Sequence, residues 1–99
     1  MKPNSLLIDQ RDNVVTVMAD LNPGEAAIFS SHTDPESPPR VVMATDAIPY
    51  GHKIAVEDLA AGEAVVKYGY PIGTATVAIP RGSHVHMHNV RSQRIGEHA

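Results

Sequence analysis

The chain contains no cysteine and no tryptophan, and phenylalanine occurs only once, at Phe29. Without cysteine, the chain itself cannot form disulfide bonds, use thiolate catalysis or hold cysteine-ligated zinc or iron–sulfur centres. A length of 99 residues predicts a single domain. With so few aromatic residues, its core must consist mainly of Val, Ile, Leu and Ala side chains, and the β-branched residues among them favour strands.

Basic clusters and long apolar runs are also lacking. The net charge is −3 at pH 7, and Arg91 and Arg94 are the nearest approach to a basic cluster. The sequence therefore has no electrostatic footprint for nucleic-acid binding. No apolar run is long enough to span a membrane, and the start of the chain lacks the apolar core of a signal peptide. We therefore expect a cytoplasmic protein that binds neither nucleic acid nor membrane.

Four segments share one pattern: an apolar residue, two residues, a glycine, two residues and a second apolar residue. The glycines are Gly24, Gly51, Gly62 and Gly82. Because glycine adopts positive φ readily, the pattern predicts a chain that arrives at a turn and leaves it as a strand. The spacing of the segments is irregular, so we interpret them as a recurring turn and not as a solenoid repeat.

Short strands are predicted between these turns. The candidates, rich in β-branched residues, are 13–19, 40–45, 63–69, 74–80 and 84–90. A turn is expected at "YPIG" between the third and fourth of them, and only residues 55–62 resemble a helix, of little more than one turn. Residues 30–40, with three prolines, predict a surface loop. The fold class is thus mainly β, with at most one or two short helical turns.

The segment "HVHMHN" places three of the six histidines at alternate positions. Side chains alternate between the two faces of a strand. A strand here would therefore bury Val85 and Met87 and present His84, His86 and His88 on one open face.

This spacing limits the metal sites that the segment could form. On a regular strand adjacent members of the set lie roughly 6.5–7 Å apart and the outer two roughly 13 Å apart. Two imidazoles, but not three, can then converge on one ion, as the pair His84/His86 or His86/His88 with further ligands from elsewhere. Imidazole can also bind an anion or transfer protons without a metal. The spacing does not decide between these roles.

Two further stretches carry candidate ligand-binding side chains. His52 and Lys53 follow the turn glycine at 51, and Lys67, Tyr68 and Tyr70 lie between an apolar strand and the "YPIG" turn. Lysine and tyrosine in such places suit recognition of carboxylates and hydroxyls. The structural alternative is that Lys67 is a solvated lysine on an edge strand and that the two tyrosines cap the core.

The stretch "AIPYGHKIAVEDLAAGEAVVKYGYPIGTATVAIPRGSHVHMHN" resembles the small domain of the altronate/galactarate dehydratase family, of the type called SAF or β-clip. The matching motifs are I-P-x-G-H-K-I-A, D-L-x-x-G-E, V-x-K-Y-G-x-P-I-G and a closing V-H-x-H-N. The resemblance spans about residues 12–90. It implies an N-terminal extension at 1–11, an SAF-type domain at 12–91 with the 30–40 loop as an insertion, and a flexible tail at 92–99.

The resemblance also implies a function. In this family the small domain either precedes a large catalytic region or forms a separate small subunit. The chain is therefore expected to be the small subunit of a metal-dependent lyase, inactive without its large subunit. The reaction expected is dehydration of a sugar acid such as altronate or galactarate. The expected cofactor is a divalent metal, typically Fe²⁺, which the large subunit could hold.

Individual roles follow from the matched motifs. His86 and His88 are expected to be catalytic and are the candidate metal ligands, while His84 lies before the family motif and is expected to be incidental. The expected substrate contacts are His52, Lys53, Lys67, Tyr68 and Asn89. Two alternatives stay open. One is the small subunit of a sulfolactate sulfo-lyase, and the other is a non-catalytic SAF-type binding or assembly module that forms a homo-oligomer.

Overall fold

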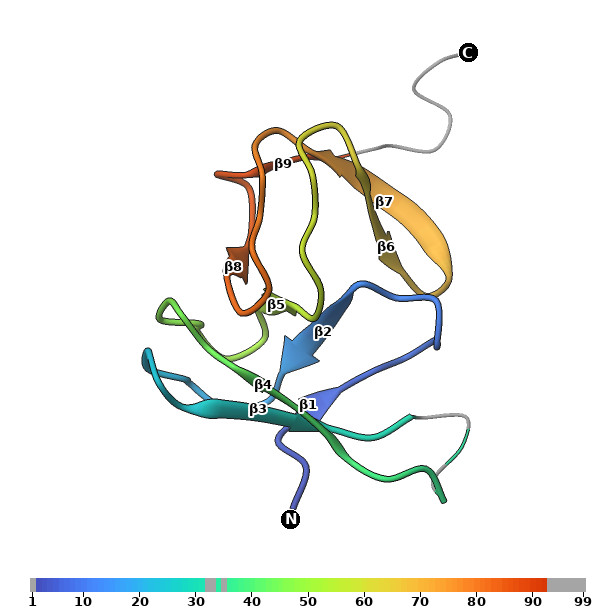
Figure 1. The fold of residues 1–99 in the computed structure, drawn as a ribbon, viewed down its shortest axis with the longest axis vertical. Coiled ribbons are helices and arrows are strands. Elements are labelled where there is room, and N and C mark those ends of the chain that lie inside the picture. Colours follow the sequence, from blue (N-terminus) through green and yellow to red (C-terminus); the bar gives the residue numbers. More distant parts are fainter. Residues whose placement is uncertain (1, 32–33, 35, 93–99) are drawn as a thin grey trace.

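The computed structural model describes residues 2–31, 34 and 36–92, and it consists of short strands joined by turns (Figure 1). The strands are β1 (Ser5–Leu6), β2 (Val14–Val17), β3 (Ala26–Phe29), β4 (Arg40–Met43), β5 (Lys53–Ala55), β6 (Ala64–Lys67), β7 (Tyr70–Ala75), β8 (His84–Val85) and β9 (Val90–Ser92). No helix occurs in these residues, so the mainly β, SAF-type fold class is confirmed.

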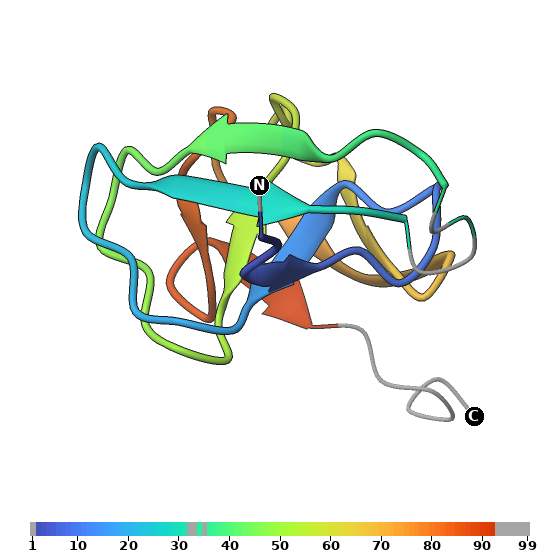
Figure 2. The same ribbon diagram turned by 90° about the horizontal axis from the view of Figure 1, so that it is seen from below.

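The strands form three antiparallel sheets. A four-stranded sheet has the order β1-β2-β5-β8, and it lies between the hairpin β3-β4 and the sheet β6-β7-β9 (Figure 1). The view from below shows the β3-β4 hairpin crossing over the four-stranded sheet (Figure 2). Two apolar clusters form the core: Phe29, Ile48 and Ile54 are fully buried in one, and Leu59 and Val65 in the other.

The four glycine turns are confirmed. Gly24, Gly51, Gly62 and Gly82 have φ values of 90°, 82°, 89° and 92°. The apolar residues that open the four segments pair across the fold, as isolated bridges between Leu21 and Ile48 and between Leu59 and Ile79. The turns therefore join strands of different sheets and bring distant parts of the chain together.

The expectation of a helix at 55–62 is wrong. Ala55 ends β5, and Leu59 is buried and exchanges both backbone hydrogen bonds with Ile79 at 2.8 Å. The Gly62 N–H donates to the carbonyl of Ala75, also at 2.8 Å. The backbone groups of this stretch are therefore satisfied by pairing across the fold, which a single helical turn could not provide.

The hairpin β6-β7 turns earlier than predicted. Its two turn residues are Tyr68 and Gly69, with φ values of 58° and 74°, and not "YPIG". Positive φ at both central residues is the arrangement preferred in two-residue hairpins. Pro71 lies within β7 at a register shift opposite Val65 and Val66, a place where the missing N–H of proline is tolerated.

The sheet begins before residue 12, where the sequence predicted the domain to start. Ser5 and Leu6 pair with Val17 and Thr16, and the side chain of Leu7 is buried. At the other end, Ser92 still belongs to β9, and the rest of the predicted tail lies outside the described residues. Residues 32, 33 and 35 of the predicted loop also lie outside them.

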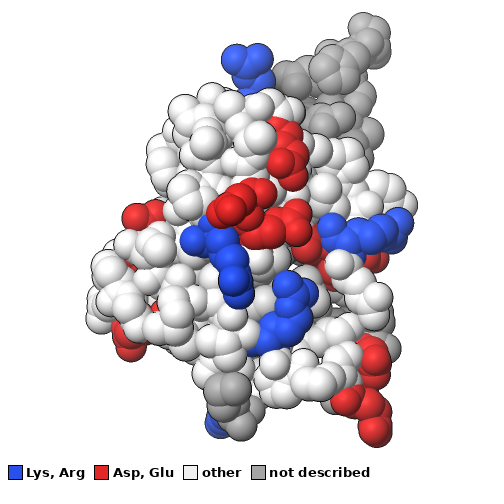
Figure 3. Space-filling view, in the orientation of Figure 1, with Lys and Arg blue, Asp and Glu red and all other residues white. Residues whose placement is uncertain are grey.

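The surface in Figure 3 carries charges of both signs. Acidic side chains gather across the middle of this face, and basic side chains border them (Figure 3). Within the described part of the chain, no helix is long and apolar enough to cross a membrane.

Candidate active site

The histidine segment is a strand followed by a turn. Strand β8 ends at Val85, and residues 86–89 form a turn that Asn89 closes. The buried Asn89 amide accepts a hydrogen bond from the His86 N–H at 2.9 Å through Oδ1 and donates to the carbonyl of His84 at 2.8 Å through Nδ2. Both polar atoms of the Asn89 side chain are therefore hydrogen-bonded to the backbone, and the residue stabilises this turn.

The turn changes the expected pattern of burial. Val85 is buried as predicted, but Met87 is 80% exposed, so its predicted burial is wrong. The prediction of one continuous strand face is also wrong, because the chain leaves the strand after β8.

The imidazole rings nevertheless gather, and His52 from the turn before β5 joins them. The ring centroids of His52 and His86 are 4.2 Å apart with 9° between the ring planes. His84 lies 5.1 Å from His52, 5.4 Å from His86 and 5.2 Å from His88. We call these four residues the imidazole cluster.

His84 is the residue that contacts every other member. Its Nε2 lies 2.8 Å from Nδ1 of His52, so one ring donates and the other accepts. Its backbone N–H donates to the Asp46 carboxylate at 3.0 Å. From the sequence, His84 was predicted to be incidental because it precedes the family motif. The pairing of Ile54 with His84 across β5 and β8, which sets this position, cannot be read from a motif.

The cluster favours neutral imidazole. Burial lowers the pKa of His84, and His52, His88 and His86 lower it further, while Asp46 opposes them. The pKa of His86 is also lowered, first by desolvation and then by His52, His88 and Lys53. At neutral pH these two rings are therefore mainly uncharged and able to accept a proton.

Two lysines, on β5 and on β6, form a second group of polar side chains. Lys67 of β6 donates from Nζ to the hydroxyl of Thr16 at 2.6 Å, and Thr16 is the cross-strand partner of Lys53. Thr16 has no signal in the sequence that would have marked it as a site residue. Burial lowers the pKa of both lysines, and Lys67 lowers that of Lys53 further.

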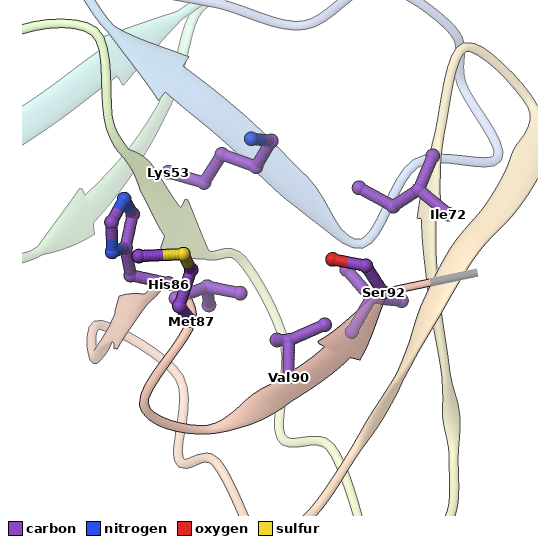
Figure 4. Close-up of a pocket in the computed structure, with 8 residues that line it drawn as sticks. Lys53, Ile72, His86, Met87, Val90 and Ser92 are labelled. Carbon is purple, nitrogen blue, oxygen red and sulfur yellow. The ribbon is translucent and has the colours of Figure 1, made fainter. Parts of the chain in front are cut away.

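A pocket of about 170 Å³ connects the two groups. Lys53 and His86 both line it, and they lie on the same side of the group of side chains, with Ile72 and Ser92 on the other side (Figure 4). The remaining lining residues are Val65, Ile72, Val85, Met87, Val90 and Ser92. The pocket thus has mainly apolar walls with a few polar groups, as small-molecule sites commonly have.

The predicted substrate contacts are partly brought together. His52, Lys53, Lys67 and His86 surround this region, and Lys67 lies 5.1 Å from the centre of the Tyr68 ring. Tyr68 is 55% exposed and Tyr70 is 72% exposed, so neither caps the core.

The imidazole cluster does not form a metal centre by itself. In the part of the chain that the structure describes, no three His, Cys, Asp or Glu side chains are arranged to hold an ion. Nearly parallel stacked rings direct their in-plane lone pairs side by side and not toward one point. No ring contact is formed between His86 and His88 among the described residues, and each of them contacts His84.

Known proteins resemble this chain over most of its length. The altronate/galactarate dehydratase SAF domain family matches residues 3–93. Altronate dehydratase of Escherichia coli is 41% identical over 81 residues, covering 82% of this chain and 15% of the enzyme. The (2R)-sulfolactate sulfo-lyase subunit alpha of Chromohalobacter salexigens is 53% identical over 49 residues, covering 50% of this chain and 52% of that subunit.

The matched part spans about half of the sulfo-lyase subunit and about a sixth of the dehydratases, of which the Bacillus subtilis enzyme is 35% identical over 85 residues. With its all-strand fold and its match over residues 3–93, this chain belongs to the altronate/galactarate dehydratase SAF domain family.

Proposed function

We propose that this chain is the small SAF-type part of a metal-dependent lyase that removes water from a sugar acid of the altronate or galactarate type. Its imidazole cluster and lysines would complete an active site that a large catalytic subunit mostly forms. The observation that carries this proposal is the pocket that joins His86 to Lys53. A proton acceptor and cations on one pocket suit the removal of a proton from an anionic substrate.

Each of these residues has its own role in the proposed reaction. The lysines hold negative charge of the substrate, and neutral His86 accepts the proton from the carbon next to the carboxylate. The electron pair of that C–H bond forms a carbon–carbon double bond as the hydroxyl leaves the next carbon. The leaving hydroxyl takes its proton from an acid of the large subunit. His52 stacks on His86 and fixes the orientation of its ring.

The large subunit would hold the divalent metal, Fe²⁺ in this proposal, which would stabilise negative charge on the substrate carboxylate. Relatives that contain much more protein than the matched segment support a large partner. A cytoplasmic location is part of the same proposal.

The small subunit of a sulfolactate sulfo-lyase is the second candidate. It is favoured by the 53% identity to subunit alpha of the Chromohalobacter salexigens enzyme. In that reaction sulfite leaves in place of hydroxide, and the proton is still removed from the carbon next to the carboxylate.

The test is gentle affinity purification of the tagged chain from its native cells, followed by assays on altronate, galactarate and sulfolactate. We expect one stoichiometric large subunit and turnover of one of these acids by the assembly but not by the chain alone. An assembly that binds the acids without turning any over would support the non-catalytic module. A stable homo-oligomer that copurifies with no partner would contradict the two-part lyase.

A further inference from the structure

Three polar side chains from three strands meet beside the pocket. Lys67 of β6 contacts the Thr16 hydroxyl of β2 at 2.6 Å, and Thr16 stands opposite Lys53 of β5 in the sheet register. Residues directly opposite in antiparallel strands share a face. Both lysine side chains therefore lie on one side of the four-stranded sheet, and Lys67 contacts the Thr16 hydroxyl there.

Neither ammonium group has a carboxylate partner in the described part of the chain. The ion pair found there within 4.0 Å joins Arg11 and Asp9. Both lysines are nevertheless half-buried. Burial lowers their pKa values, and Asp12 acts on Lys67 only at longer range, without a hydrogen bond between them. Half-buried cations without a counter-ion attract an anion from outside the chain.

This cationic group is separate from the imidazole cluster. The amine of Lys53 points toward β2 and away from the His86 ring (Figure 4). Val85, the cross-strand neighbour of Lys53, lines the pocket. A ligand that reaches from the His86 ring to the lysine amines would thus place a charged group at the lysine end.

We propose that Thr16, Lys53 and Lys67 form a subsite for a second acidic group of the substrate. The site would thereby select 2-hydroxy acids that carry two anionic groups over those that carry one. This proposal rests on the proposed function, in which the reacting carbon and its carboxylate lie beside His86. The second group is a carboxylate or a sulfonate at the other end of the molecule, and the Thr16 hydroxyl orients it by a hydrogen bond. A sugar acid that ends in a hydroxymethyl group would leave both ammonium groups uncompensated.

The number of lysines makes this subsite directly observable. The chain contains three lysines, Lys2, Lys53 and Lys67, so selective ¹³C labelling of lysine gives one side-chain signal for each. Sulfoacetate serves as a probe with two acidic groups, and acetate and methanesulfonate serve as probes with one. Titrations at constant ionic strength on the intact chain keep charge screening the same for all three probes.

We expect sulfoacetate to shift the signals of Lys53 and Lys67 but not that of Lys2. Its affinity should exceed that of either single-headed probe at least tenfold. Lys53→Met and Lys67→Met should each remove this preference, Thr16→Val should weaken it, and the matched control Lys2→Met should leave it intact. Backbone amide spectra of each variant verify that the fold is kept. Equal affinities for the three probes, or a response of Lys2 alone, would overturn the proposal.

This measurement requires neither a partner nor turnover. If the probe binds as expected while the purified assembly is inactive on all the acids, the proposed function fails and the subsite stands. If the assembly turns over altronate as fast as galactarate or sulfolactate, the lyase function stands and the selection of a second acidic group fails.

Discussion

His86 is the residue on which the proposed chemistry depends. It stacks on His52, lines the pocket with Lys53 and has a lowered pKa. His86→Gln in the assembled enzyme should lower kcat by roughly a hundredfold or more, the usual contribution of a general base. It should also remove the acid limb of the kcat/KM profile, which in the unaltered enzyme lies below pH 6.5 because the base must be unprotonated.

The control for this variant is Val77→Ala, since Val77 is exposed and does not line the pocket. A His86→Gln enzyme with an unchanged pH–rate profile would exclude His86 as the proton acceptor.

His84 should make the stability of the chain depend on pH. Its pKa in the folded chain is lowered from 6.5, so the unfolded chain takes up protons first as the pH falls through that value. The free energy of unfolding should therefore be greatest above about pH 7 and should decline toward pH 5. Urea denaturation between pH 5 and 8 measures this decline, which His84→Asn should reduce. Identical pH dependence in the variant would show that His84 does not contribute to it.

At the scale of elements, substitution of Gly82 tests how closely its turn approaches strand β4. Gly62 and Gly82 have nearly the same φ, 89° and 92°. A Cβ on Gly62 would meet nothing within 4 Å, whereas one on Gly82 would meet the carbonyl oxygen of Met43 at 2.4 Å. Gly62→Ala should cost about 1 kcal/mol from backbone strain alone. Gly82→Ala should cost at least about 2 kcal/mol more, because the clash is with backbone. Equal losses in denaturant titration would contradict the close approach.

Asn13 holds strand β6 at its register shift. The buried Asn13 side chain accepts from the Val66 N–H at 2.8 Å and donates to the carbonyl of Ala64 at 2.9 Å. Asn13→Ala should lower the free energy of unfolding by about 1–2 kcal/mol, because the Val66 N–H and the Ala64 carbonyl both lose their buried amide partner. The exposed Asn22→Ala is the control and should change stability by less than about 0.5 kcal/mol. Equal losses in the two variants would show that Asn13 is not needed at the shift.

Local signals predicted the elements that depend on local geometry. The glycine pattern predicted the four turns, and runs of β-branched residues predicted β2, β4 and β6. The helix at 55–62 was predicted wrongly, because the partners of its backbone are Ile79 and Ala75, far along the chain. The turn at 86–89 was missed because it depends on Asn89 reaching back to the backbone of His84.

The site could be predicted in part. The motifs identified His52, Lys53, Lys67 and His86, which the fold brings to one pocket region. The positions of Thr16 and His84 follow from strand pairing between segments separated by thirty or more residues. Pairing at that distance leaves no trace in a local pattern.

At the scale of the whole molecule, the pocket is open and small, and its polar lining residues are His86, Lys53 and Ser92, with no carboxylic acid among them. A lyase needs an acid for the leaving group as well as a base. In the proposed enzyme the large subunit supplies this acid and covers the pocket, so the two parts share one reaction.

Reconstitution tests this central claim most directly. Turnover of the substrate is measured for the chain alone, for the large subunit alone, and for the two mixed, with the mixture repeated using His86→Gln and with assembly verified in each case. The account predicts activity only in the mixture of unaltered parts, and loss of that activity in the His86→Gln mixture although the complex still forms. Full turnover by the large subunit alone, or by the His86→Gln complex, would contradict it.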